Sequence, residues 1–157
     1  MEEKEKKKYH TPEVALQKLQ AYCAYQERCH QEVTTKLADL GVYGDKADAI
    51  ISQLITDNFL NEERFAIAYA RGKFRIKHWG KIKIRQGLKQ RYIPEFSIKK
   101  AMAAIDTEGG YFETLEKVIT TKAKDYEGDK QKKQKLAHYA MQRGFESDLI
   151  WEFLKDF

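Results

Sequence analysis

The sequence predicts an all-α protein built from three tandem three-helix repeats. Three observations support this fold class. Only 2 prolines and 9 glycines interrupt the 157 residues, which favours long helices over strands and turns. Apolar residues recur at helical spacing, and the apolar positions themselves repeat three times along the chain. We expect the repeats to stack into an elongated, curved array that turns either to the right or to the left.

The individual helices are placed by their start signals and their apolar spacing. Thr11 before Pro12 is typical of a helix start, with the threonine as N-cap and the proline in the first turn. Asn61 before two glutamates marks another start. The pattern predicts nine helices, over 12–26, 30–40, 45–57, 61–77, 81–91, 95–105, 111–126, 129–143 and 147–156.

The repeat appears when the chain is shifted by 51 and then by 52 residues, because apolar residues then coincide without a gap. Chance alignment would explain one pair of amphipathic helices, but not three helices with their turns in three copies. The predicted organisation is a disordered lead over 1–10 and repeats over 11–58, 59–108 and 109–157. The aligned positions include Val33, Ile84 and Leu136; Leu37, Leu88 and Ala140; Val42, Ile93 and Phe145; Ala15, Ala66 and Val118; Ala47, Ile98 and Ile150.

Composition limits the partners and the compartment. The formal net charge is +5, which favours polyanions or acidic protein surfaces as partners. Cys23 and Cys29 are too few for a disulfide framework and indicate a reducing compartment. The charged stretch 1–8 lacks the apolar segment of a secretory signal, and no apolar run approaches the roughly 18 residues of a membrane span. We expect a cytoplasmic monomer with no membrane contact.

The middle of the sequence is strongly basic. No acidic residue lies between Glu63 and Glu95, and Phe74, Trp79 and Tyr92 are interleaved with the cations. A solvated helix face usually mixes both signs, so this segment predicts a surface that neutralises phosphates or contacts an acidic groove, with aromatic rings available for stacking on bases. As a group, the predicted binding residues are Arg71, Lys73, Arg75, Lys77, Lys81, Lys83, Arg85, Lys89 and Arg91.

The cations from Arg71 to Lys77 occupy every second position, and this period of two is typical of a strand. The stretch could therefore be a strand or a helix. The repeat register and the lack of turn residues before His78 favour a helix. Its cations then point in several directions near its C-terminal end, where they also suit the helix dipole.

The remaining motifs are weak. Cys29-His30 has no second pair at metal spacing, so buried thiols are expected and no metal or cofactor. The histidines have no neighbouring groups that suggest catalysis, and we expect no active site. Gly109-Gly110 is interpreted as a linker, and Trp151 as a core residue.

The second repeat resembles the central motif of the RecX family. The resemblance rests on 61–66 (Asn-Glu-Glu-Arg-Phe-Ala), on the basic residues that lead to Gly80, and on the segment up to Ile93. The stretch from Leu54 to Leu60 and the segment 142–145 also fit. Two features depart from the family: Tyr92 replaces the usual glycine, which predicts a strained or differently shaped turn, and lysine often replaces arginine in the basic stretch.

The resemblance implies a regulatory protein with three tandem three-helix units that lies in the groove of a RecA filament on DNA. It implies suppression of ATP hydrolysis and strand exchange, and an influence on filament assembly in recombination, DNA repair and the SOS response. The nine basic residues would line the contact surface, with single- or double-stranded DNA as an additional contact. The alternative is a stand-alone basic helical nucleic-acid-binding module, which the charge and the aromatic residues alone would support.

Overall fold

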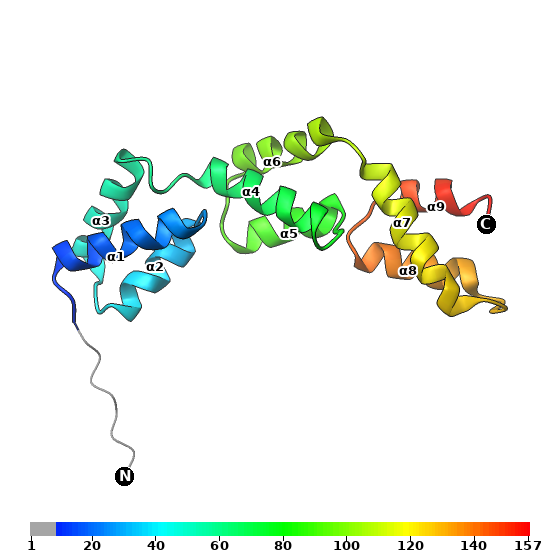
Figure 1. Cartoon of the computed structure of the whole chain (residues 1–157), viewed down its shortest axis with the longest axis horizontal. Helices are drawn as coiled ribbons and strands as arrows, with labels where there is room; N and C mark the ends of the chain where they lie inside the picture. Colours follow the sequence, from blue (N-terminus) through cyan, green and yellow to red (C-terminus); the bar gives the residue numbers. More distant parts are fainter. Residues whose placement is uncertain (1–8) are drawn as a thin grey trace, which may run out of the picture. The chain divides into compact units, whose positions relative to one another are not determined.

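The structure is a computed structural model that describes residues 9–157 (Figure 1). This part of the chain is all-α, with nine α-helices, one 3-10 helix and no strand, as the sequence predicts. Residues 1–8, most of the predicted disordered lead, lie outside the described residues. The helices are α1 (Pro12–Tyr25), α2 (His30–Asp39), α3 (Gly44–Thr56), α4 (Glu62–Arg75), α5 (Lys81–Gln90), α6 (Glu95–Glu108), α7 (Tyr111–Ala123), η1 (Lys124–Tyr126), α8 (Lys132–Gln142) and α9 (Ser147–Leu154).

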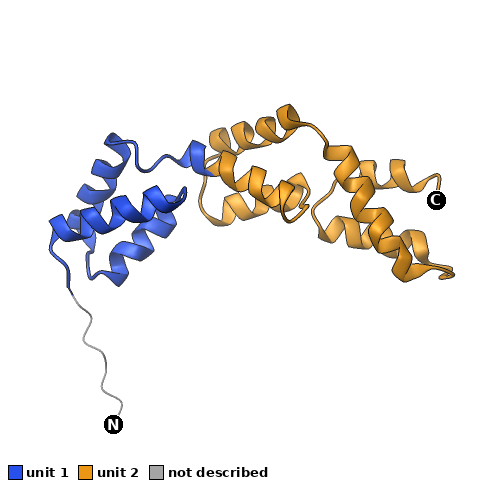
Figure 2. Cartoon of the chain, in the orientation of Figure 1, with its two compact units in different colours: residues 1–65 blue, residues 66–157 orange. Residues whose placement is uncertain are grey.

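The chain divides into two compact units, residues 1–65 and 66–157, which Figure 2 colours separately. The division falls inside α4. No described helix is long and apolar enough to cross a lipid bilayer.

In the first unit, α1, α2 and α3 pack against one another. The hydroxyl of Thr11 accepts a hydrogen bond from the Val14 N–H at 3.3 Å, which confirms the predicted N-cap of α1. The three helices enclose an apolar core that stabilises the unit. This core includes Ala15, Leu19, Cys23, Val33, Leu37, Leu40, Val42, Ala47, Ile50, Leu54 and Leu60.

Arg64 fixes the loop that leads into α4. Its guanidinium donates to the side-chain oxygen of Asn58 at 3.1 Å and to the backbone carbonyl of Asn58 at 3.0 Å. It also pairs with the Glu27 carboxylate. The Asn61 side chain caps α4 by accepting from the Arg64 N–H at 2.9 Å. The Asn-Glu-Glu-Arg segment that carries the family resemblance therefore contributes to architecture.

In the second unit, α5 packs against α6, and α7, α8 and α9 form a second apolar cluster. The aligned positions of the three repeats are buried as the repeat predicts. Val33, Ile84 and Leu136 are each 0% exposed. Trp151 is not one of these aligned positions but was also predicted to lie in the core; it is 42% exposed, so that prediction was wrong.

Helices α2, α5 and α8 end in the same backbone turn. The residues in the left-handed region are Gly41, Tyr92 and Gly144, with φ of 76°, 57° and 96°. In each turn the next N–H donates to the carbonyl five residues earlier, as a helix C-cap with a left-handed residue does. These donors and acceptors are Val42 to Leu37, Ile93 to Leu88, and Phe145 to Ala140. The predicted strain at Tyr92 is confirmed.

The start of α5 joins the end of α8. The Gly80 N–H donates to the Arg143 carbonyl at 2.8 Å, and the Ile82 N–H donates to the Gly144 carbonyl at 2.9 Å. Between them, the Lys81 N–H donates to the hydroxyl of Tyr111 at 2.9 Å. The first N–H groups of a helix have no partner within it, so the end of α8 and Tyr111 supply partners for the start of α5.

Aromatic packing reinforces this junction. The Tyr111 ring lies between Phe74 and Phe145, with ring centroids 5.7 and 5.4 Å away. Its hydroxyl donates to the Glu146 carboxylate at 2.5 Å. Burial, and then this bond to Glu146, raises the pKa of Tyr111 and keeps the hydroxyl protonated as a donor.

Candidate binding surface

The nine predicted binding residues lie on α4, on α5 and on the residues that follow each helix. The stretch with strand-like alternation is helical as far as Arg75, and the Lys77 N–H continues the turn by donating to the Lys73 carbonyl at 3.2 Å. The prediction of a helix over this stretch is confirmed. The nine side chains nevertheless fall into three sets of three with different surroundings.

The first set, the paired cations, consists of Arg75, Lys81 and Arg85. Each forms an ion pair with an acidic residue of α6. The pairs are Arg75 with Glu108, Lys81 with Asp106, and Arg85 with Glu95. The Arg85 hydrogen bond holds the pKa of the Glu95 carboxyl below its usual range. The sequence between Glu63 and Glu95 contains no acidic residue, but in the folded protein acidic side chains of α6 lie beside its cations.

The second set, the ring-stacked cations, consists of Lys73, Lys83 and Arg91. The ammonium groups of Lys73 and Lys83 lie 4.9 and 4.4 Å from the ring centroid of Trp79. The Arg91 guanidinium lies 4.9 Å from that of Tyr69. A cation over a ring face is attracted by the ring quadrupole, so these side chains are held without losing their charge.

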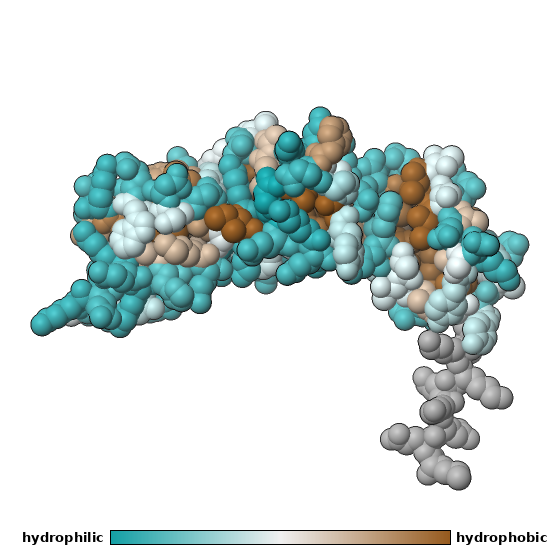
Figure 3. All heavy atoms as spheres, turned by 180° about the vertical axis from the view of Figure 1, so that it is seen from behind, coloured by the Kyte–Doolittle hydropathy of each residue, from teal (hydrophilic) through white to brown (hydrophobic). Residues whose placement is uncertain are grey.

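The third set, the unpaired cations, consists of Arg71, Lys77 and Lys89. All three are exposed, and none forms an ion pair with any residue that the structure describes. Hydrophilic side chains cover much of the face in Figure 3, with hydrophobic ones in patches between them. These three cations are the ones most available to an external anion.

The three interleaved aromatic residues also differ. Phe74 is buried against Tyr111 and is not available for stacking on a base. Trp79 is half-buried beneath its two lysines, whereas Tyr92 is 80% exposed. Of the predicted stacking residues, only Tyr92 presents an open ring.

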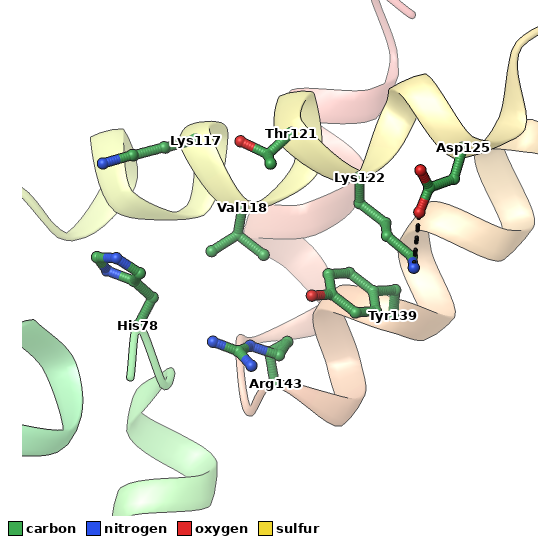
Figure 4. Close-up of a pocket in the computed structure, with 8 residues that line it drawn as sticks. All are labelled: His78, Lys117, Val118, Thr121, Lys122, Asp125, Tyr139 and Arg143. Carbon is green, nitrogen blue, oxygen red and sulfur yellow. Dashed lines mark ion pairs between the residues drawn. The ribbon is translucent and has the colours of Figure 1, made fainter. Parts of the chain in front are cut away.

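Sequence reasoning missed a pocket beside α7 and α8, of about 440 Å³ (Figure 4). Lys117 and Lys122 come from α7, Arg143 follows α8, and His78 comes from the α4–α5 connection. Asp125 also lines it and forms an ion pair with Lys122 at 2.9 Å. No sequence spacing links these residues. One feature of the sequence could have indicated the pocket: Lys122 lies at a repeat position that is apolar in the other two repeats.

The thiols of Cys23 and Cys29 are both buried, as predicted, and burial raises their pKa values. Within residues 9–157, no three His, Cys, Asp or Glu side chains are grouped so that they would hold a metal ion.

The fold and the cationic helices define a class: an all-α repeat protein with a basic surface on its central helices. Two family models refine this class. Residues 61–102 match the second three-helix domain of RecX, and residues 110–154 match its third three-helix domain. The chain belongs to the RecX family.

Relatives across the bacteria agree with this assignment. A regulatory protein RecX from Prosthecochloris aestuarii is 27% identical over 143 residues, which are 90% of this chain and 92% of the relative. One from Bacillus mycoides is 29% identical over 141 residues, which cover 87% of this chain and 52% of the relative. The chain thus spans nearly all of one relative and about half of the other.

Solved structures support the fold. The crystal structure of RecX from Lactobacillus salivarius superimposes with a TM-score of 0.78 at 23% identity, covering 92% of this chain and 95% of the other. A second crystal structure, of a regulatory protein RecX, gives a TM-score of 0.80 at 22% identity and covers 93% and 72%.

Proposed function

We propose that this protein is a regulator that binds the groove of the RecA–DNA filament and inhibits its ATP hydrolysis and strand exchange, and so modulates recombination and DNA repair. The observation that carries the proposal is the match of two successive domains to RecX models. The relatives bear the name regulatory protein RecX.

The basic surface supplies a physical means of binding. Three exposed cations form no ion pair in the described chain, and three more lie over aromatic rings. Such cations attract phosphates or acidic side chains over distances of about a Debye length, roughly 8 Å at physiological salt. A repeat protein that contacts several protomers at once also gains affinity from multivalency.

The test is single-stranded-DNA-dependent ATP hydrolysis by the cognate RecA, titrated with this protein. We expect inhibition by the wild type. In a variant with the unpaired cations removed, Arg71→Ala, Lys77→Ala and Lys89→Ala, the concentration for half-inhibition should rise by about tenfold or more, since a lost charged contact is worth about 1.5–3 kcal/mol.

The matched control is Arg75→Ala, Lys81→Ala and Arg85→Ala, which also removes three positive charges. Because these cations are already paired with α6, we expect a smaller loss of inhibition than with the first variant. Thermal unfolding checks that both variants fold. No inhibition by excess wild type would contradict the proposed function, and equal losses in both variants would contradict the assignment of the unpaired cations as the contact.

A second candidate is a stand-alone nucleic-acid-binding module, which the cations and the exposed Tyr92 ring favour. It predicts DNA binding without recombinase and a steep dependence on salt, with a log–log slope of about −0.7 per phosphate contact on single strands. Binding that disappears at modest salt without recombinase would count against it.

A further inference from the structure

The pocket beside α7 and α8 interrupts the repeat. Leu19 and Ala70 occupy the position equivalent to Lys122, and both are fully buried. In the third repeat this position carries an ammonium group that reaches the pocket instead of filling the core. Its ammonium lies 5.0 Å from the ring centroid of Tyr139 and pairs with Asp125.

The lining carries more positive than negative charge. Asp125 is the only carboxylate among the residues that line the pocket, and it forms an ion pair with Lys122. Lys117 is exposed and has no ion pair within the described residues, and the charge of Arg143 is likewise uncompensated there. Two cations therefore remain available to an anion in the pocket.

Two nitrogen atoms of the lining also lack partners. Arg143 is held in place because one of its terminal nitrogens donates to the Lys77 carbonyl, but its Nε is buried without a hydrogen-bond partner in residues 9–157. The same is true of the Nδ1 of His78. An unpaired buried polar group costs about 1–3 kcal/mol.

The backbone at His78 is strained as well. Its φ of 54° lies in the left-handed region, which side chains other than glycine adopt at a cost. Such strain persists where surrounding contacts enforce it and is common at ligand sites. The His78 imidazole lines the pocket and points toward Lys117 of α7 (Figure 4).

The rest of the lining includes an apolar side chain and an aromatic ring. The side chain of Val118 and the ring of Tyr139 lie between the cationic side chains (Figure 4). The volume of about 440 Å³ lies in the range of small-molecule pockets, roughly 300–1,000 Å³, and exceeds what a lone phosphate needs. An anion attached to a planar apolar body fits these surroundings.

We propose that this pocket binds a nucleotide. Lys117 and Arg143 hold the phosphate, and the base lies against Tyr139 and Val118. The nucleotide has two possible sources, a free mononucleotide or one unit of a single strand, and both offer the same chemistry. The site goes beyond the proposed function, and its test contains no recombinase, so either can fail without the other.

The experiment measures two probes on the full chain: ADP by calorimetry, and a labelled oligothymidylate by fluorescence anisotropy. In Lys117→Glu we expect the affinity for the probe that binds to fall by about tenfold or more, because a phosphate contact becomes a repulsion. The control Lys124→Glu makes the same change of charge on an exposed residue of η1 that does not line the pocket, and should change affinity by about twofold or less.

Binding of ADP would identify a free nucleotide as the ligand, and binding of the oligonucleotide alone would identify a strand. Either result, with the loss confined to Lys117→Glu, supports the site. No binding of either probe would overturn the proposal, as would equal losses in the two variants, because general electrostatic attraction would then explain the binding.

Discussion

The turns after α2, α5 and α8 share one backbone conformation but lie in three different surroundings. At Gly144, an added Cβ would lie 2.3 Å from the Cβ of Lys83 and 2.7 Å from its backbone N. At Gly41, it would lie 2.6 Å from a ring carbon of Tyr9. Tyr92 adopts the same left-handed backbone with a full side chain that is 80% exposed.

This comparison separates two reasons for a glycine. A left-handed φ costs roughly 1–2 kcal/mol for other residues, which the fold tolerates at Tyr92. Close approach of another segment leaves no room for a Cβ at all, as at Gly144. The second turn therefore accommodates a side chain, because that of Tyr92 is 80% exposed.

The largest effect is expected for Gly144→Ala. The new Cβ overlaps backbone and side-chain atoms of Lys83, and α5 must move to accommodate it, so the free energy of unfolding should fall by about 3 kcal/mol or more. Urea denaturation measures it. The control is Gly110→Ala, where φ is 78° but no atom lies within 4 Å of the added Cβ. Equal losses in the two variants would show that close approach contributes nothing.

Gly41→Ala should have an intermediate effect, a loss of about 1–2 kcal/mol. The nearest atom belongs to the Tyr9 ring, which can rotate away, although the Cα of Tyr9 lies at 3.2 Å. The same denaturation measurement in a Tyr9→Ala background should give a smaller loss. A loss that is unchanged in that background would assign the whole effect to the backbone.

Tyr92→Gly should have the smallest effect and the opposite sign. Removing the left-handed strain stabilises the folded state, and the greater freedom of glycine in the unfolded chain offsets part of the gain. We expect the free energy of unfolding to rise by at most about 1 kcal/mol. Tyr92→Ala keeps the strain and should not raise it. A clear fall for Tyr92→Gly would mean that the ring packs against the fold.

The fold was largely predictable because burial follows the repeat. The aligned positions at Val33, Ile84 and Leu136 needed only the apolar pattern. The strain at Tyr92 followed from the family resemblance, in which a glycine usually stands at this position. Trp151 failed because it lies beside the apolar stripe of α9 on a partly exposed face, and periodicity does not resolve neighbouring positions at the edge of a stripe.

The candidate surface was less predictable, since ion pairs depend on tertiary contacts. Arg75 and Glu108 are 33 residues apart, and only the packed helices bring them together. Phe74 was counted among the aromatic residues for stacking, yet its partner Tyr111 lies in the next repeat. The distribution of charge along a short segment of sequence does not predict such ion pairs or such burial.

The backbone bonds between the start of α5 and the end of α8 also bear on cooperativity. Backbone carbonyls at the end of α8 accept hydrogen bonds from backbone N–H groups at the start of α5, and these N–H groups have no partner within their own helix. In repeat arrays, stability is close to a sum of terms for each repeat and for each interface between neighbours. Here the interface term includes two main-chain hydrogen bonds, which no substitution except one to proline removes directly. The loss of the last turn of α8 would leave the first amides of α5 without these partners, and we therefore expect the second and third repeats to unfold together.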